Sequence, residues 1–552
     1  MSDPELPARQ PDMASDDDHT DHVPATRPPE AAPQRTAATP TASEVPLTFE
    51  TDEGAAFAPV APPSPPRRWS RPTVRQLKRA EEAHADYTNE HDNRWNSDTR
   101  LPAEESIHLG GVTLVEAFTP STVSNLYSVL RKWPKRWPGR EDDWTAALER
   151  SRAGASGGWT TLGIVRRGSG FIAGDGHQDQ SLPEGVQAAW LNLNYLLPSV
   201  AIVTATFAFE DDFADLSSIL RSDFETQYED VKIEVYGPLG RYRQHIPWSR
   251  PKQHGSSAQI LDVPFGKRRS IDDRVRERER ACGEWFYAQF PGRFASAAPQ
   301  ERPTFRLLFT EQARPFEGRT MWLEPVGLDW SPNVYRCTDL PGWALKSDRR
   351  PIRGERYVVT VAARRGDVGK NGATDMTGRS NWSLTQRFSR EQHKLAAVYS
   401  LVPLLDIYGG CLARLRDEAS KKRRIRRPVN DARRLDRYLV TDGLDAATIA
   451  PDISAYTDDL MRFRWNVPEY TEDQTEMPER FKRDPIEFVP QLCEVLHARS
   501  GRIIEDTANT DGNIRASAEL RQAVANTRLQ RTVVLFTIAA VLLAIITLVH
   551  GG

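Results

Sequence analysis

The residues best suited to chemistry lie in a polar, glycine-rich stretch. Gly168, Gly170 and Gly174 follow a predicted strand at 159–165. A glycine loop after a strand can hold phosphate when it opens a helix whose N–H groups face the anion. Here no apolar-periodic helix follows, and the spacing departs from G-x-G-x-x-G. Two interpretations stay open, a phosphate-binding loop and, more simply, a polar turn.

Three side chains that can ligate a metal alternate in the same stretch. Asp175, His177 and Asp179 are two residues apart, and carboxylate and imidazole groups are common metal ligands. Alternating polar residues are also typical of a solvated turn, which is the simpler interpretation. A further acidic cluster at 210–215 is explained by negative charge at a predicted helix start.

Two other glycine motifs resemble functional sites, but their surrounding sequence does not fit those sites. Residues 154–158 read G-x-S-x-G, but a nucleophile elbow needs a strand before the serine, and here the strand follows. Residues 366–372 resemble a phosphate loop but lack Ser or Thr after Lys370. We therefore predict no catalytic residue and name no cofactor.

The strongest charge feature is a run of cations at 421–427, just before Pro428. Such a run attracts anionic lipid by about 1 kcal/mol per residue near a membrane surface. A solvated linker is an equal alternative. Nucleic acid ranks behind both, since the net charge of the whole chain is −3. The predicted lipid contacts are Lys421, Lys422, Arg423, Arg424, Arg426 and Arg427.

The chain is organised around an apolar run at 532–549 that contains no charge, Pro or Gly. A helix of this length just crosses a hydrocarbon core of about 30 Å. We interpret it as a transmembrane tail anchor, and a buried core helix is the alternative. Ala539, Ala540 and Ala544 give it a small-residue face for homo-oligomerisation. The predicted anchor residues are Val533, Leu535, Phe536, Ile538, Leu542, Leu543, Ile545, Ile546 and Leu548.

The flanks of this run predict its orientation. Arg515, Arg521, Arg528 and Arg531 precede it, and no Lys or Arg follows. The positive-inside rule then places the N-terminal region in the cytoplasm and the C-terminus across the inner (plasma) membrane. The first ten residues, MSDPELPARQ, show no signal-peptide pattern.

Length and composition limit the number of domains and the state of the cysteines. A length of 552 residues allows two to four domains, and the 39% hydrophobic content is low for a globular chain. Cys282, Cys337, Cys411 and Cys493 form no C-x-x-C pair, which favours reduced structural thiols over disulfides or zinc.

The order of patterns predicts an α+β fold with five regions. We expect a disordered Pro/Ala/Ser/Thr-rich tail at 1–70 and a charged linker at 71–105. A mixed α/β cytoplasmic region at 106–385 should precede a helical, coiled-coil-like stalk region at 386–530 and the transmembrane anchor at 531–550.

Within these regions, local signals predict individual elements. Strands are expected at 110–118, 159–165, within 188–211, and at three places in 303–362, one of them TMWLEPVGLDW. Thr119 and Pro120 should start one helix and Ser270 should cap another. A long helix is expected at 389–422, bent at Pro403 or at 409–410, with Asp406 opposing a second membrane span. The last helix should run into the anchor, with Gly501 and Gly512 as interruptions.

One architectural likeness stands out in the last third of the chain. The segment LRQAVANTRLQRTVVLFTIAAVLLAIITL is similar in character to the junction between stalk and membrane in CorA-type magnesium channels. The resemblance implies an oligomeric channel or transporter subunit. The chain departs from that family because no Gly-Met-Asn follows this helix, and its last methionine is Met477.

These patterns predict a single-pass, tail-anchored membrane protein with a cytoplasmic binding or scaffolding domain. A CorA-like channel subunit and a membrane-tethered enzyme are the alternatives. The expected partners are the lipid bilayer and further copies of the chain.

Overall fold

The computed structural model describes residues 88–133, 144–154, 157–167, 176–178, 182–232, 256–340, 342–347, 357–368, 380–420, 439–459 and 467–550. The chain divides into two units at Pro72, and all described residues belong to the second, Thr73–Gly552. The tail predicted at 1–70 lies outside them.

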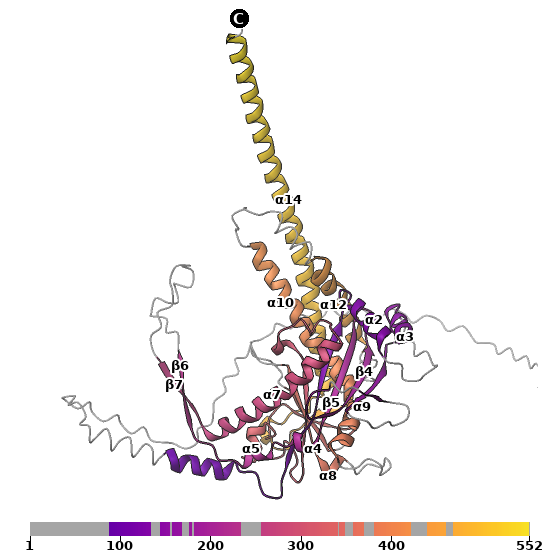
Figure 1. The fold of residues 1–552 in the computed structure, drawn as a ribbon, viewed down its shortest axis with the longest axis vertical. Helices are drawn as coiled ribbons and strands as arrows, with labels where there is room; N and C mark the ends of the chain where they lie inside the picture. Colours follow the sequence, from indigo (N-terminus) through magenta and orange to yellow (C-terminus); the bar gives the residue numbers. More distant parts are fainter. Residues whose placement is uncertain are drawn as a thin grey trace, which may run out of the picture. The chain divides into compact units, whose positions relative to one another are not determined.

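The second unit is built on a mixed ten-stranded sheet with the order β12-β9-β10-β11-β8-β1-β5-β4-β2-β3 (Figure 1). The predicted combination of α and β structure is confirmed. At the centre, β1 pairs antiparallel with both β5 and β8, and β8 pairs parallel with β11. These strands are β1 (Ile107–Phe118), β4 (Val186–Tyr195), β5 (Ala201–Phe209), β8 (Thr304–Thr310) and β11 (Val358–Arg364).

Short strands extend the sheet at both ends. On one side are β2 (Gly158–Arg166) and β3 (Gly176–Gln178), and on the other β10 (Trp343–Ser347), β9 (Val334–Cys337) and β12 (Tyr470–Glu472). A separate ribbon pairs β6 (Gln227–Lys232) with β7 (Ser256–Leu261). The strand β12 comes from the region predicted to be helical. TMWLEPVGLDW, predicted as a strand, contains turns and the 3-10 helix η2 (Glu324–Val326), where Pro325 cannot donate to a ladder.

Helix α7 (Val263–Gln289) covers one face of the sheet. Its Trp285 ring lies 5.8 Å from that of Phe207, and Gly283 faces Leu114. The prediction that Ser270 caps this helix is wrong. The helix begins at Val263, and the side chain of Asp262 accepts the Phe265 N–H.

Helix α9 (Asn381–Tyr399) covers the opposite face. Its Thr385 hydroxyl donates to the Gly110 carbonyl, and its Tyr399 ring lies 5.5 Å from Phe305. Helix α10 (Leu401–Ser420) follows directly, so the predicted long helix breaks at Ser400 and not at Pro403 or 409–410. The apolar window within 381–417 is 83% buried inside the protein, which identifies a core helix pair.

The last helix, α14 (Phe488–His550), is continuous over 63 residues. It packs against α10 and against α12 (Leu444–Asp458), as Figure 1 shows. The predicted continuity into the apolar run is confirmed, but Gly501 and Gly512 do not interrupt the helix. Glycine keeps its backbone N–H and C=O and can form the helical hydrogen bonds, so a single glycine costs only about 1 kcal/mol relative to alanine.

The remaining elements are short. Helix α2 begins at Val123 with Thr122 at its N-cap, so Thr119 and Pro120 precede the helix instead of starting it. Residues 88–98 are helical. The other helices are α2 (Val123–Lys132), α3 (Trp144–Arg152), α4 (Asp211–Ala214), α5 (Ser217–Arg221), α8 (Arg365–Val368), η1 (Pro299–Glu301), η3 (Leu439–Gly443) and η4 (Glu479–Phe481).

Candidate functional site

Most of the predicted polar site residues lie outside the described residues. This holds for Gly168, Gly170, Gly174, Asp175 and Asp179 and for the six cations at 421–427. The backbone of His177 is described, in β3, where it pairs with Val165 of β2. Among the described residues, no three His, Cys, Asp or Glu side chains are grouped to hold a metal ion. The phosphate, metal and lipid sites therefore stay predictions.

Sheet topology nevertheless places one of the predicted clusters. The pairings make β2, β3, β5, β8 and β11 mutually parallel, so their carboxyl ends share one edge of the sheet. The acidic cluster at 210–215 directly follows β5 at that edge, whereas the predicted loop residues 168–175 lie outside the described residues. Crevices at the carboxyl ends of parallel strands are common ligand sites.

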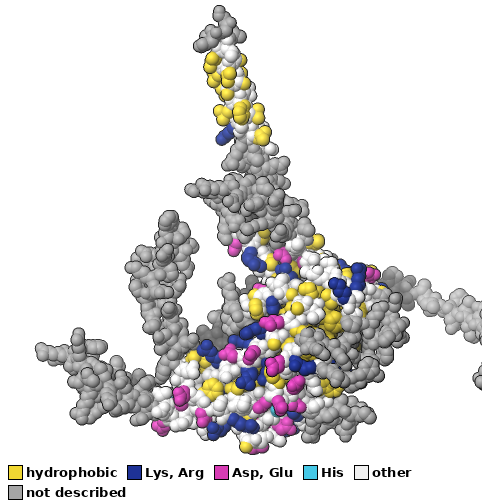
Figure 2. Space-filling view, in the orientation of Figure 1, with side chains coloured by type: hydrophobic (Ala, Val, Ile, Leu, Met, Phe, Trp, Pro, Cys, Tyr) yellow, Lys and Arg dark blue, Asp and Glu magenta, His cyan; other side chains and the backbone are white. Residues whose placement is uncertain are grey.

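The predicted anchor residues sit on the far end of α14. Eight of the nine have side chains between 51% and 73% exposed, and the side chain of the ninth, Leu548, is outside the description. Figure 2 shows hydrophobic side chains gathered on the visible face of this end of the helix. The hydroxyls of Thr537 and Thr547 donate to the carbonyls of Val533 and Leu543, so these polar groups are satisfied within the helix.

A cavity of about 490 Å³ lies between α9 and the strands β2 and β4. Its wall on the sheet side includes Trp159 and Thr161 of β2 and Asn192 of β4, and α9 contributes Arg390 and His393. The volume falls in the range of about 300–1,000 Å³ that is usual for small-molecule sites. None of these residues was predicted to form a site.

On the sheet side β4 turns two asparagines toward α9, and Asn192 is the one that lines the cavity. Asn192 pairs with Thr204 across the sheet and accepts a hydrogen bond of 3.0 Å from the Thr161 hydroxyl. Asn194 is fully buried, and its Oδ1 lies 3.0 Å from Nδ1 of His393. In the sequence, the two asparagines oppose a membrane span and, by alternating with leucines, indicate a strand. Their alternation with leucines was the available signal for a buried polar row.

His393 is the most strongly perturbed group in the cavity wall. It is 1% exposed, and burial, reinforced by the Lys394 charge, lowers its pKa to about 3. The imidazole is therefore neutral near pH 7. With its Nδ1–H donated to Asn194, Nε2 is left as an acceptor without a partner among the described residues. A base with so low a pKa is poorly matched to proton transfer near neutrality, so the cavity favours binding over acid–base chemistry.

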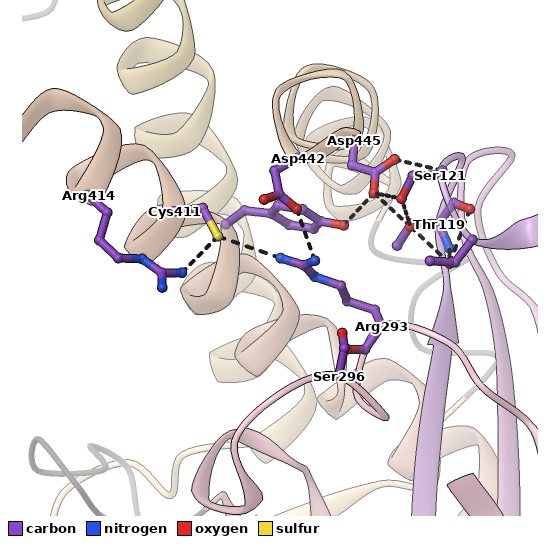
Figure 3. A network of polar contacts seen from close by, with 10 residues as sticks. Thr119, Ser121, Arg293, Ser296, Cys411, Arg414, Asp442 and Asp445 are labelled. Atoms are coloured by element: carbon purple, nitrogen blue, oxygen red, sulfur yellow. Dashed lines mark hydrogen bonds and ion pairs between the residues drawn. The ribbon is translucent and has the colours of Figure 1, made fainter. Parts of the chain in front are cut away.

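A second polar cluster joins the sheet to the helices beside α14 (Figure 3). The buried carboxylate of Asp445, at the start of α12, accepts hydrogen bonds from the hydroxyls of Thr119, Ser121 and Tyr408 at 2.7, 2.6 and 2.9 Å. It also accepts the Ser121 backbone N–H at 2.9 Å. Hydrogen bonds to an ionised carboxylate are strong, so these four contacts hold α12 against α10 and against the segment that follows β1.

Arg293 continues this cluster. Its guanidinium lies 2.9 Å from Asp442, 5.1 Å from the centre of the Tyr408 ring and 3.6 Å from the Cys411 sulfur. Arg414 contacts the same sulfur from the other side at 3.2 Å. The cluster therefore connects the ends of β1 and α7 to α10 and α12, the helices that pack on α14.

Comparisons with protein-family models, with curated proteins and with solved structures found no match for this chain.

Proposed function

We propose that the chain is a membrane-anchored binding protein. The end of α14 crosses the bilayer, and the α/β unit presents a small-molecule cavity on the cytoplasmic side. The observation that carries the anchor is the exposed apolar segment Leu529–Thr547, in which none of the residues is buried.

The distribution of apolar side chains favours lipid over a protein partner as the cover of this segment. A helix that packs on one protein surface has an apolar stripe and a polar opposite face. Here Phe536, Leu542 and Ile545 are all more than half exposed although they project in different directions around the helix. At about 1.5 Å per residue, 19 residues span about 28 Å, close to the hydrocarbon thickness.

The anchor is tested by separating the membranes of cells that express the full chain. We expect the protein to stay with membranes through alkaline carbonate washing and to be released by detergent. Recovery of the intact chain in the supernatant after high-speed sedimentation without detergent would overturn the proposal.

Contact with anionic lipid by the cations at 421–427 is part of this proposal. The support is their number and charge, which suit a leaflet rich in acidic headgroups. A chain without 529–552 should bind vesicles that contain phosphatidylserine and not vesicles of phosphatidylcholine alone. Equal binding after all six cations are changed to Gln would remove the lipid contact.

A CorA-like channel subunit is the second candidate. It is favoured by the unbroken helix of 63 residues that runs from contacts with α10 and α12 into the apolar segment. A pore would need several copies, with Ala539, Ala540 and Ala544 allowing close helix contact. Crosslinking in membranes should then show oligomers, and purified protein should pass ions in a liposome flux assay. Monomers without flux would exclude it.

A further inference from the structure

The interior of the cavity contains hydrogen-bonding groups that the protein leaves unpaired. Nε2 of His393 and Nε1 of Trp190, both in residues that line the cavity, are buried and have no partner among the described residues. An unpaired buried polar group costs about 1–3 kcal/mol. Their roles are fixed: His393 Nε2 accepts, because Nδ1 carries the proton toward Asn194, and the indole N–H of Trp190 donates. A ligand that offers both donors and acceptors recovers this cost.

One wall of the cavity is a flat aromatic surface. Trp159 is 45% exposed although it lies on a strand of the sheet. Its ring contacts His393 at a centroid distance of 4.8 Å and lies 5.5 Å from the Lys394 ammonium. An exposed indole beside a polar cavity is a stacking surface for a planar ring, and stacking of a base on an aromatic side chain contributes about 1–3 kcal/mol.

The helix side of the cavity is cationic. Arg390 and Lys394 are four residues apart on α9, and both line the cavity. Among the described side chains that line the cavity, Glu391 is the one acidic residue, so these side chains carry a net charge of plus one with neutral His393. A guanidinium and an ammonium close together suit the oxygens of a phosphate group.

These three features point to one class of ligand. We propose that the cavity between α9 and strands β2 and β4 binds a nucleoside phosphate, with the base stacked on Trp159 and the phosphate held by Arg390 and Lys394. The sugar hydroxyls and base edges supply the donors and acceptors that the buried groups lack. This inference rests on the binding half of the proposed function and is independent of the membrane anchor.

The test uses the full chain in mild detergent, so that a failure of membrane attachment does not affect the result. The probes are AMP, GMP, CMP and UMP, with adenosine, ribose 5-phosphate and inorganic phosphate as partial ligands. Binding is measured by calorimetry and by quenching of tryptophan fluorescence. We expect at least one mononucleotide to bind at micromolar to millimolar concentration, and the partial ligands to bind at least about tenfold more weakly.

A pair of variants locates the site. Arg390→Gln with Lys394→Gln should weaken nucleotide binding by about tenfold or more. The matched control, Arg276→Gln with Arg280→Gln, removes two exposed arginines with the same spacing from α7 on the opposite face of the sheet and should leave binding unchanged. Trp159→Leu should abolish the quenching and weaken binding. All five positions are at least partly exposed, so these variants are expected to fold.

Three results would overturn the inference. The first is an absence of binding by all four mononucleotides at millimolar concentration. The second is equal affinity for inorganic phosphate or ribose 5-phosphate, which would show that the base is not recognised. The third is an equal loss of affinity in the α7 control, which would place binding outside the cavity.

Discussion

The Asp445 carboxylate accepts a hydrogen bond from the Thr119 hydroxyl at 2.7 Å, although 326 positions separate the two residues in the sequence. Thr119 comes directly after the central strand β1, and Asp445 lies at the start of α12, which packs on α14. The contact explains why Thr119 does not cap α2, because its hydroxyl is turned toward α12. This hydrogen bond therefore connects the central sheet to α12 and, through the packing of α12, to α14.

We therefore predict that Asp445→Asn lowers the free energy of unfolding by about 3 kcal/mol, because an amide cannot accept all the converging donors. Thermal unfolding of the full chain in mild detergent measures this. Asp458→Asn is the control, since that carboxylate is on the same helix with 68% of its side chain exposed. Equal destabilisation by both variants would contradict a special role for Asp445.

A buried ion pair between the sheet and α7 gives a second prediction. Arg306 Nε of β8 lies 2.7 Å from Glu279 Oε1, whose side chain is 2% exposed. Among the described residues, Glu279→Ala leaves the largely buried guanidinium with Asp272 as its one carboxylate partner, at 3.1 Å, and should cost about 3 kcal/mol of stability.

The control for this pair is on the same helix. Asp273 contacts Arg276 at 3.9 Å, and both side chains are more than half exposed. Asp273→Ala should change stability by less than about 1 kcal/mol. Urea unfolding of both variants would contradict the argument if the exposed change were the more costly one.

The central strands could be predicted from the sequence because their signals are local. The β-branched run at 200–206 and the alternation of Asn192 and Asn194 with leucines were enough for β5 and β4. The strands β9, β10 and β12, at one end of the sheet, were not predicted because each has at most five residues and depends on pairing with other segments. The start of α7 was misplaced because Asp262 and Pro264 were overlooked as its cap and first turn.

The candidate cavity was harder to predict than the fold. The cavity has no contiguous motif, because it combines Trp159, Asn192 and His393 from three segments that only the tertiary fold brings together. A single asparagine or histidine is common in a protein core and carries no signal alone. The anchor, by contrast, is one contiguous run whose composition is sufficient to propose it.

Glu116 gives a prediction on pH. It is fully buried in β1, and burial raises its pKa from 4.5 to about 8, opposed by the backbone N–H groups of Phe294, Ala117 and Ala295. Between pH 4.5 and about 8 the Glu116 carboxyl therefore stays protonated in the folded chain, whereas it loses its proton in the unfolded chain. Stability is therefore fully present below about pH 4.5 and falls as pH rises toward 8, by about 1.4 kcal/mol per unit.

The test of this prediction compares the wild-type chain with Glu116→Gln, which does not titrate. The stability of the wild type relative to the variant should decline between about pH 5 and pH 8. A constant difference over that range would show that the N–H donors outweigh the effect of burial on the carboxyl pKa.

The two long apolar helical segments make opposite predictions for the same substitution. Leu404 in α10 is fully buried, whereas Ile538 and Leu542 on α14 are 51% and 55% exposed. Leu404→Arg places an unpaired charge in the core and should cost about 4 kcal/mol or prevent folding. Ile538→Arg with Leu542→Arg should leave thermal unfolding of the α/β unit unchanged and oppose insertion by about 2.5–3.5 kcal/mol per arginine at a helix centre.

Flotation of membranes on a density gradient separates anchored protein from aggregates. The chain with the two α14 arginines should leave the floated fraction, while Leu404→Arg should stay in it. Retention of the α14 variant on membranes would mean that another segment holds the protein there, and α14 would then need a protein partner to cover its apolar end.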